Sequence, residues 1–319
     1  MEAPPFRLVL DSGATSCRYV TYQEPSIPLS SGVLNGINYT EEGEGGILRL
    51  FSELKLLLQG GAAPDVIGIA LAGAGRKDIN RRVRRDLLKH LPENWGHLGL
   101  YFFHDGEAAL WAALGDKPGI VVAAGTGSIA SGRDPEGSPL RAGGWGRLAG
   151  DEGSAYWIGL RAVQVALRAF DGREEDTLLE KTLCDNIGLK ETQELVAWVH
   201  LPERTKDEIA ALAPLVEDAA NRGDAPGLKI IDEAAYELAA LALTLIKKGG
   251  FSSEVRVGTT GSVFRKNVRV FEGFKRYIKA QYPASDIQKP RGDNLQGAIE
   301  LTESLLVEKD PRRIRSYSW

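Results

Sequence analysis

The sequence predicts an α/β protein with two similar lobes, each built on a mixed β-sheet flanked by helices. Two apolar runs about a third of the chain apart, Leu8–Leu10 and Ile120–Ala124, have the pattern of buried strands, and each ends in a short turn bounded by glycine. The same order of strand, turn, strand and helix follows from each run, which is the pattern of a structural repeat. A chain of 319 residues is also long for a single hydrophobic core, which favours two domains.

The first lobe is expected to alternate strands and helices. The strands fall at residues 6–10, 17–22, 66–71 and 98–103, and the helices at residues 46–58, 79–90 and 107–114. The first two strands flank the first turn closely enough to form a hairpin. The turn-rich segment Leu114–Gly119 ends the lobe. We therefore place an N-terminal lobe at residues 1–115 and a C-terminal lobe at residues 116–319.

The second lobe is expected to begin with a hairpin and to continue as a helix-rich domain. The expected order is a strand at 120–124, the turn Gly125–Ser128, a return strand at 129–133, a tight turn at 134–137, mostly helical sequence from 154 to 248 and a strand at 255–257. Two helices then close the chain. The last of them is the element that can return to pack on the N-terminal lobe.

Composition and charge argue against several classes of protein. The chain has 43% hydrophobic and 26% charged residues, as ordinary globular proteins do, and its net charge of −4 gives no electrostatic footprint for nucleic acid. The longest apolar run, Leu238–Ile246, is too short to span a bilayer, and the N-terminus lacks the pattern of a signal peptide. Cys17 and Cys184 lie far apart and support neither a disulfide framework nor a zinc or iron–sulfur site. We therefore expect a cytoplasmic protein without a membrane or nucleic-acid partner.

The first turn, Asp11–Ser16, has the residue types of a phosphate site. Small residues let backbone N–H groups approach a ligand closely, and together with hydroxyl groups they suit phosphate oxygens. Asp11 ends its strand, where α/β sheets hold ligands, and can hold Mg²⁺ through water while the residues at 14–16 hold phosphate oxygens. The alternative is an aspartate that only caps a turn. The second turn, Gly125–Ser128, favours the phosphate interpretation.

Asp105 follows the aromatic strand Tyr101–Phe103 and precedes a helix. A carboxylate at that point can orient an attacking hydroxyl group and accept its proton, which is the general-base role in phosphoryl transfer. The alternative is that Asp105 only caps the helix, since aspartate is a favoured N-cap residue. The neighbouring His104 has no partner pattern in the sequence, and we expect it to be structural.

Two further glycine-rich segments have the residue types of ligand-binding loops. Gly143–Trp157 contains five glycines, two acidic residues and two tryptophans. That composition suits a loop around a sugar, because aromatic faces stack on C–H edges and carboxylates accept hydroxyl protons. Gly258–Phe264 follows a strand and precedes a helix, and its glycines would let a flat adenine ring lie on the backbone. For both segments a plain glycine-rich turn is the alternative.

Together these segments resemble the BadF/BadG/BcrA/BcrD-type ATPase family, and within it the N-acetylglucosamine and glucosamine kinases of the sugar kinase/actin/Hsp70 superfamily. The matching segments are Asp11–Thr15, Gly36–Asn38, Leu71–Gly75, Asp105–Leu110, Ala124–Ser128 and Gly143–Trp157. The last is the most specific, with Gly-Gly-Trp-Gly followed by Gly-Asp-Glu-Gly-Ser-Ala-Tyr-Trp. The resemblance covers nearly the whole chain and implies two lobes of the actin/ribonuclease H type with a cleft between them.

The resemblance also implies roles for the matching residues. Asp11 resembles the aspartate that orients the metal ion, and Asp105 resembles the base that takes the proton from the sugar hydroxyl group. The implied ATP-binding residues are Asp11, Gly13, Ala14, Thr15, Gly125, Thr126, Gly127, Ser128, Gly258 and Gly261. The implied substrate-binding residues are Asn38, Gly73, Asp105, Thr126, Trp145 and Asp151. ATP and Mg²⁺ are the implied cofactors, and a homodimer is the implied assembly.

The leading functional prediction is ATP-dependent phosphorylation of a hydroxyl group of N-acetylglucosamine, glucosamine or a related hexosamine. One alternative is the ATPase activator of a 2-hydroxyacyl-CoA dehydratase or benzoyl-CoA reductase, which carries iron–sulfur ligands in the second half of the fold, where this chain has only Cys184. The other is a sugar or nucleotide sensor without turnover, and the presence of Asp11, Asp105 and Thr126 argues against it. Ile129 stands where N-acetylglucosamine kinases tend to carry asparagine, so the exact hexosamine stays open.

Overall fold

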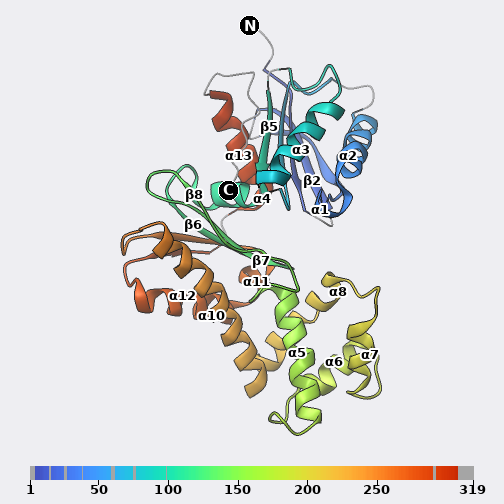
Figure 1. Ribbon diagram of the computed structural model, residues 1–319, viewed down its shortest axis with the longest axis vertical. Helices are drawn as coiled ribbons and strands as arrows, with labels where there is room; N and C mark the ends of the chain where they lie inside the picture. Colours follow the sequence, from blue (N-terminus) through green and yellow to red (C-terminus); the bar gives the residue numbers. More distant parts are fainter. Residues whose placement is uncertain are drawn as a thin grey trace. The chain divides into compact units, whose positions relative to one another are not determined.

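The computed structural model describes residues 4–13, 16–24, 27–37, 39–58, 62–74, 77–97, 99–289 and 292–307. The chain divides into two units: residues 1–117 with 291–319 form the first unit, and residues 118–290 form the second. Each unit contains one five-stranded sheet with helices packed on it (Figure 1). The predicted α/β class, with two lobes on mixed sheets, is therefore confirmed. Among the described residues, no helix has the length and apolar character needed to cross a membrane.

The sheet of the first unit has the strand order β3-β2-β1-β4-β5. Its strands are β1 (Arg7–Ser12), β2 (Ser16–Glu24), β3 (Ile27–Asn35), β4 (Val66–Leu71) and β5 (Gly99–His104). The first three pair antiparallel in succession, whereas β4 runs parallel to β1 and β5 runs parallel to β4. In this register Ser12 pairs with Leu71, and Leu71 pairs with His104. The three parallel strands therefore end at the same edge of the sheet.

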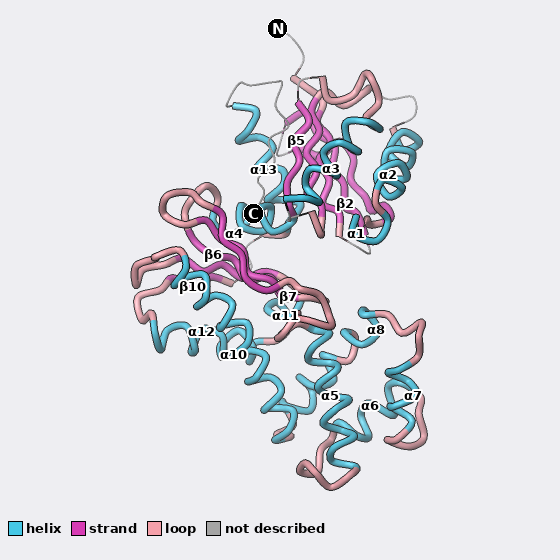
Figure 2. The backbone as a smooth tube through the Cα atoms, viewed as in Figure 1, coloured by secondary structure: helices cyan, strands magenta, loops and turns pink. Residues whose placement is uncertain are grey.

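Helices cover both faces of this sheet, because successive residues of its strands point to opposite sides and both sides are apolar. The helices are α1 (Tyr39–Glu42), α2 (Glu44–Leu57), α3 (Lys77–His90), α4 (Asp105–Leu114) and α13 (Asn294–Val307). Leu8 and Leu10 belong to a buried cluster with residues of α2 and α3, whereas Val9 belongs to one with residues of α4 and α13. Figure 2 shows the magenta strands between α13 and α2.

The helix α13 completes the core of the N-terminal unit from the far end of the chain. A Cβ on Gly297 would lie 1.9 Å from the carbonyl oxygen of Ala108, so the two helices α13 and α4 meet backbone to backbone at this glycine. The Tyr22 hydroxyl group donates to Glu303 Oε1 at 2.9 Å, and Arg7 Nε lies 2.6 Å from the same oxygen. Close helix contact and an ion pair therefore fix α13 on the sheet.

The sheet of the second unit has the strand order β10-β9-β6-β7-β8. Its strands are β6 (Gly119–Ala124), β7 (Ser128–Arg133), β8 (Pro139–Gly143), β9 (Arg256–Thr260) and β10 (Asp286–Gln288). The first three pair antiparallel in succession, whereas β9 runs parallel to β6 and β10 runs parallel to β9. Taken from β8, this order matches that of the first sheet strand for strand, so β1 and β6 hold equivalent central positions.

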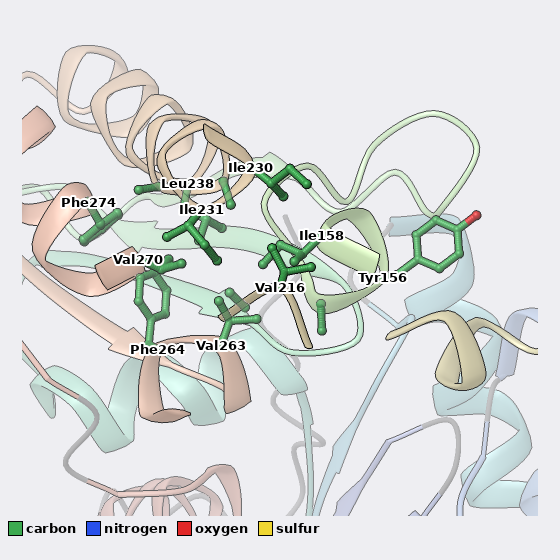
Figure 3. Close-up of a cluster of buried hydrophobic side chains, with 14 of the residues drawn as sticks. Tyr156, Ile158, Val216, Ile230, Ile231, Leu238, Val263, Phe264, Val270 and Phe274 are labelled. Carbon is green, nitrogen blue, oxygen red and sulfur yellow. The ribbon is translucent and has the colours of Figure 1, made fainter. Parts of the chain in front are cut away.

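One hydrophobic core holds the second unit together. The helices of the second unit are α5 (Ala155–Phe170), α6 (Leu179–Ile187), α7 (Glu194–His200), α8 (Lys206–Ala210), α9 (Ala213–Asn221), α10 (Ala225–Lys248), α11 (Ser262–Lys266) and α12 (Val268–Gln281). Buried side chains of α5, α9, α10, α11 and α12 meet in one cluster with those of β6. Figure 3 shows Ile158 of α5, Val216 of α9 and Ile231 of α10 turned toward this core.

Three strands in the structure were not expected from the sequence, and all three lie at sheet edges. The residues of β3 are mostly exposed, and its sequence Ile-Pro-Leu-Ser-Ser-Gly-Val-Leu-Asn lacks apolar alternation. The strands β8 and β10 have five and three residues, too few for a periodic signal. The prediction of two closing helices was wrong, because α11, α12 and α13 all follow β9. The helix α11 has only five residues and shows no period either.

Candidate functional site

The first glycine-bounded turn follows β1, and the carboxylate of Asp11 in this strand is ion-paired with Arg18. Asp11 and Arg18 are paired residues of β1 and β2, and Arg18 Nη2 donates to Asp11 Oδ2 at 2.6 Å. The other guanidinium nitrogen, Nη1, donates to Asp293 Oδ2 at 2.5 Å, just before α13. Burial raises the pKa of Asp11 from its ordinary value, and the hydrogen bond from Arg18 offsets this only in part. A carboxylate that is costly to keep ionised is typical of ligand sites.

Hydrogen bonds fix the backbone around this turn. The Gly13 N–H donates to the Ser16 carbonyl oxygen at 2.9 Å. The Ile37 N–H donates to the Gly13 carbonyl oxygen at 2.9 Å and lies 3.2 Å from the Ser12 hydroxyl oxygen, which also accepts it. The backbone at Ile37, two residues after β3, is therefore tied directly to the first turn.

Three of the predicted contact residues fall outside the described residues. These are Ala14 and Thr15, predicted to contact phosphate, and Asn38, predicted to contact the sugar. Gly73, also predicted to contact the sugar, lies in the turn that follows β4 and has a φ of 76°. The left-handed backbone at this position favours glycine.

Asp105 begins α4 at the edge of the sheet where β5 ends. Its Oδ1 accepts the Gly106 N–H at 2.9 Å and lies 2.8 Å from His104 Nε2. The N-cap residue of α4 is His104, whose Nδ1 accepts the same N–H at 3.1 Å. The N-cap position thus belongs to His104, while the Asp105 side chain also accepts an N–H of the first turn. The charge of Asp105 contributes to the raised pKa of Asp11, so the two carboxylates share one edge of the sheet.

The second glycine-bounded turn follows β6 and is hydrogen-bonded to the start of α5. The Gly125 N–H donates to the Gly127 carbonyl oxygen at 2.9 Å, and the Ala155 N–H donates to the Gly125 carbonyl oxygen at 2.8 Å. The Ser128 N–H donates to Asp151 Oδ1 at 3.2 Å. In the second unit the structure therefore brings together the predicted phosphate turn and one predicted sugar-binding residue.

Asp151 adopts a strained backbone and is ion-paired. Its φ of 65° is the only positive value among the non-glycine residues that the structure describes, and the residue is buried. Lys206 Nζ donates to Asp151 Oδ2 at 2.6 Å, and the Thr126 hydroxyl group donates to Asp207 Oδ1 at 2.9 Å. Two residues at the start of α8 thus hold side chains at the second turn. Such strain costs roughly 1–3 kcal/mol and clusters at functional sites.

An apolar pocket adjoins the second turn. Gly261 has a φ of 99°, and a Cβ there would lie 2.2 Å from the carbonyl oxygen of Ala124, so this glycine packs directly on the end of β6. The pocket is lined by Ala155, Ile158, Ala211, Pro214, Val263 and Lys266, among others. Its mostly apolar lining, beside a turn suited to phosphate, fits a flat heterocycle such as adenine. Gly258 lies inside β9, where it pairs with Val121.

The Gly-Gly-Trp-Gly segment starts at the last residue of β8 and continues into a loop in which Trp145 and Gly146 are exposed. Trp145 is 66% exposed, and the Arg141 guanidinium group lies 5.2 Å from the centre of its ring. Arg141 Nη2 also donates to the Gly144 carbonyl oxygen at 2.9 Å. A Cβ on Gly144 would lie 2.7 Å from Ile129 Cδ1, so Ile129 packs against the backbone of this loop. An exposed aromatic face of this kind can stack on a sugar.

Sequence reasoning missed three residues that contact the predicted site residues and a fourth that contacts one of these three. The first three are Arg18, Lys206 and Asp207, and the fourth is Asp293, which pairs with Arg18. The hairpin register could have found Arg18, because a tight turn after Ser12 sets it opposite Asp11. The other contacts join residues that are 55 to 275 positions apart in the sequence, and no local sequence pattern predicts them.

The two cysteines are free, buried thiols. Burial raises the pKa of Cys17 to about 12, and it also raises the pKa of Cys184, which lies in α6. The thiolate is the form that binds metals, so neither environment favours a metal ligand. The iron–sulfur activator gains no support from these two residues.

Comparison with known proteins identifies the family. The model of the BadF/BadG/BcrA/BcrD ATPase family matches residues 10–299. The chain belongs to this family. An N-acetylmuramic acid/N-acetylglucosamine kinase of Clostridium acetobutylicum is 34% identical over 242 residues, which cover 75% of this chain and 78% of that protein. An N-acetyl-D-glucosamine kinase of Dictyostelium discoideum is 33% identical over 187 residues, which cover 57% of this chain and 58% of that protein.

Solved structures agree with this family assignment. A Chromobacterium violaceum protein, described as a candidate N-acetylglucosamine kinase, has a TM-score of 0.74 and 27% identity, with 94% of this chain and 100% of that chain covered. A glucokinase of Streptomyces griseus, solved with glucose and AMPPNP, has a TM-score of 0.57 at 14% identity and therefore shares only the fold. The family and these relatives make the chain a sugar kinase that uses ATP, as the sequence predicted.

Proposed function

We propose that this chain transfers the γ-phosphoryl group of ATP to a hydroxyl group of an amino sugar, with N-acetylglucosamine, glucosamine and N-acetylmuramic acid as candidate acceptors. The observation that carries the proposal is the pair of carboxylates, Asp11 and Asp105, at the edge where β1 and β5 end. Ligands of α/β proteins bind at this edge. The names of the two curated relatives support an amino sugar as the acceptor.

Asp105 is the general base in this proposal. As the sugar oxygen bonds to the γ-phosphorus atom, the carboxylate of Asp105 accepts the hydroxyl proton, and the bond to the bridging oxygen breaks so that ADP leaves with the electron pair. The second turn, Gly125–Ser128, holds phosphate oxygens. Trp145 and Asp151 contact the sugar. The apolar pocket beside Gly261 takes the adenine base.

Mg²⁺ is assigned to Asp11 through water. A carboxylate is a hard oxygen donor, and Mg²⁺ usually keeps several waters while it binds one or two carboxylates and the substrate phosphates. Among the described residues, no group of three or more acidic, histidine or cysteine side chains could hold a metal ion alone. The single carboxylate of Asp11 suits an ion that is also held by the phosphates of the nucleotide. When bound, it would neutralise charge on the phosphate oxygens.

A coupled assay for ADP release tests the proposed activity. The acceptor panel comprises N-acetylglucosamine, glucosamine, N-acetylmuramic acid and glucose, and we expect faster turnover with at least one amino sugar than with glucose. Asp105→Asn should lower kcat by roughly 10²- to 10⁴-fold, the usual contribution of a general base, while calorimetry still detects ATP binding. ADP release that does not depend on any sugar, or binding without turnover, would overturn the proposal. Near-normal turnover of Asp105→Asn would remove the base assignment.

The assembly and location of the chain remain predictions. The resemblance implies a homodimer, which sedimentation of the purified protein tests. A cytoplasmic location is expected from the sequence and is tested by fractionation of cells that express the chain. Neither prediction bears on the chemistry assigned to Asp105.

A further inference from the structure

His104 occupies the junction between β5 and α4, directly beside the proposed base. The residue is 4% exposed and is the N-cap of α4. Its Nδ1 accepts the Gly106 N–H at 3.1 Å. A ring nitrogen that accepts a hydrogen bond carries no proton, so the imidazole proton is on Nε2. The helix cap therefore selects the tautomer of this histidine.

The protonated nitrogen of His104 faces the carboxylate of Asp105. Nε2 lies 2.8 Å from Asp105 Oδ1, a distance at which it donates a hydrogen bond to the charged oxygen. The Gly106 N–H donates to the same oxygen at 2.9 Å. Two donors on Oδ1 fix the rotation of the carboxyl group about its Cβ–Cγ bond. The direction of Oδ2 is fixed by the same two bonds.

We propose that His104 is a positioning residue for Asp105 in sugar phosphorylation. It does not exchange a proton with the substrate; it holds the carboxylate in the orientation that receives the hydroxyl proton. This inference rests on the proposed function, in which Asp105 is the base. A misplacement of a reacting group by about 1 Å can cost roughly 100-fold in rate, so the bond from Nε2 has a measurable consequence.

Two amide variants separate the cap from the positioning bond. In His104→Asn the amide oxygen stands near the place of Nδ1 and can accept the Gly106 N–H, but the side chain is too short to reach Asp105 from the place of Nε2. In His104→Gln the amide nitrogen stands near the place of Nε2 and can donate to Asp105, but the cap bond is weakened. Each variant thus keeps one bond of the imidazole and loses the other.

The expected result is that the two variants rank in opposite order for activity and stability. His104→Asn should lower kcat by roughly 10- to 100-fold with the KM for sugar and for ATP nearly unchanged, and should melt close to the wild-type temperature. His104→Gln should recover most of kcat and melt a few degrees lower, as loss of an N-cap predicts. If His104 were only a cap, His104→Asn would be the better variant in both measurements. That result would overturn the proposal.

Asp105→Asn in the same assay separates failure of this inference from failure of the proposed function. If Asp105→Asn is inactive and His104→Asn has the wild-type kcat, Asp105 is the base and His104 does not position it. If Asp105→Asn keeps near-normal turnover, the base assignment itself is wrong. If His104→Asn is slow and His104→Gln is fast, the positioning role is supported independently of folding.

Discussion

Gly297 is the position at which one methyl group tests how α13 packs on the N-terminal unit. A Cβ there would lie 1.9 Å from the carbonyl oxygen of Ala108, well inside the 3.0 Å that real Cβ contacts respect. Alanine favours a helix over glycine by about 1 kcal/mol, but overpacking costs typically about 1–3 kcal/mol. The obstacle is helix backbone, which cannot move aside as a flexible side chain can, so the cost should lie near the upper value. We expect Gly297→Ala to destabilise the first unit by about 2 kcal/mol net.

Gly45→Ala in α2 is the matched control, because a Cβ at Gly45 would have no atom within 4 Å. That variant should be as stable as the wild type or more stable by up to about 1 kcal/mol. Each unit has its own buried hydrophobic clusters, so the assay must report the first unit by itself. We choose hydrogen exchange in urea, followed in peptides from α4 and α13. If Gly297→Ala protects these peptides as well as Gly45→Ala does, the close contact between α13 and α4 is wrong.

Three further predictions concern the two turns and the apolar pocket. Burial raises the pKa of Asp11, so the folded state holds its proton more tightly and the ionised group destabilises the fold. Asp11→Asn should therefore raise the thermal midpoint at pH 7, and this gain should fade as the pH falls to the ordinary pKa of 3.8. The same variant should abolish turnover. Ala211→Leu should fill the pocket and raise the KM for ATP but not for sugar. Lys206→Met should lower kcat/KM for the sugar roughly tenfold, which corresponds to about 1.4 kcal/mol for the charged hydrogen bond between Lys206 and Asp151. Unchanged kinetics would contradict the role of this ion pair.

The sequence predicted those parts of the fold that depend on short-range patterns. The strands at the centre of each sheet were found because they are apolar runs that end in turns. The edge strands β3, β8 and β10 were not found, because β3 is mostly exposed and the other two are only five and three residues long. Exposure removes the apolar alternation on which strand prediction rests. Pairing with a neighbouring strand then decides their structure.

Only part of the candidate site could be predicted, because exact strand ends and long-range contacts also decide its geometry. Asp11 and Asp105 stand at strand ends that the sequence marks, but the role of His104 as the N-cap residue was not predicted. The strand β5 ends at His104 rather than at Phe103, and this shift of one residue gives the cap to the imidazole. Lys206 reaches Asp151 from 55 residues away, and such a contact depends on how α8 packs. The sequence alone contains no signal for it.

A similar electrostatic arrangement occurs at the predicted site residues of both units. Asp11 is held by Arg18 and Asp151 by Lys206, both at 2.6 Å, and the two carboxylate side chains are only 11% and 6% exposed. A bare carboxylate with so little solvent would repel the phosphates of ATP, because repulsion between charges is weakly screened where water is excluded. A cation at hydrogen-bond distance cancels most of that field and still leaves carboxylate oxygens as acceptors. In the proposed site, pairing each aspartate with a basic side chain would therefore let an anion bind beside a carboxylate. Loss of either cation would leave a buried charge uncompensated, which costs more than a lost surface ion pair.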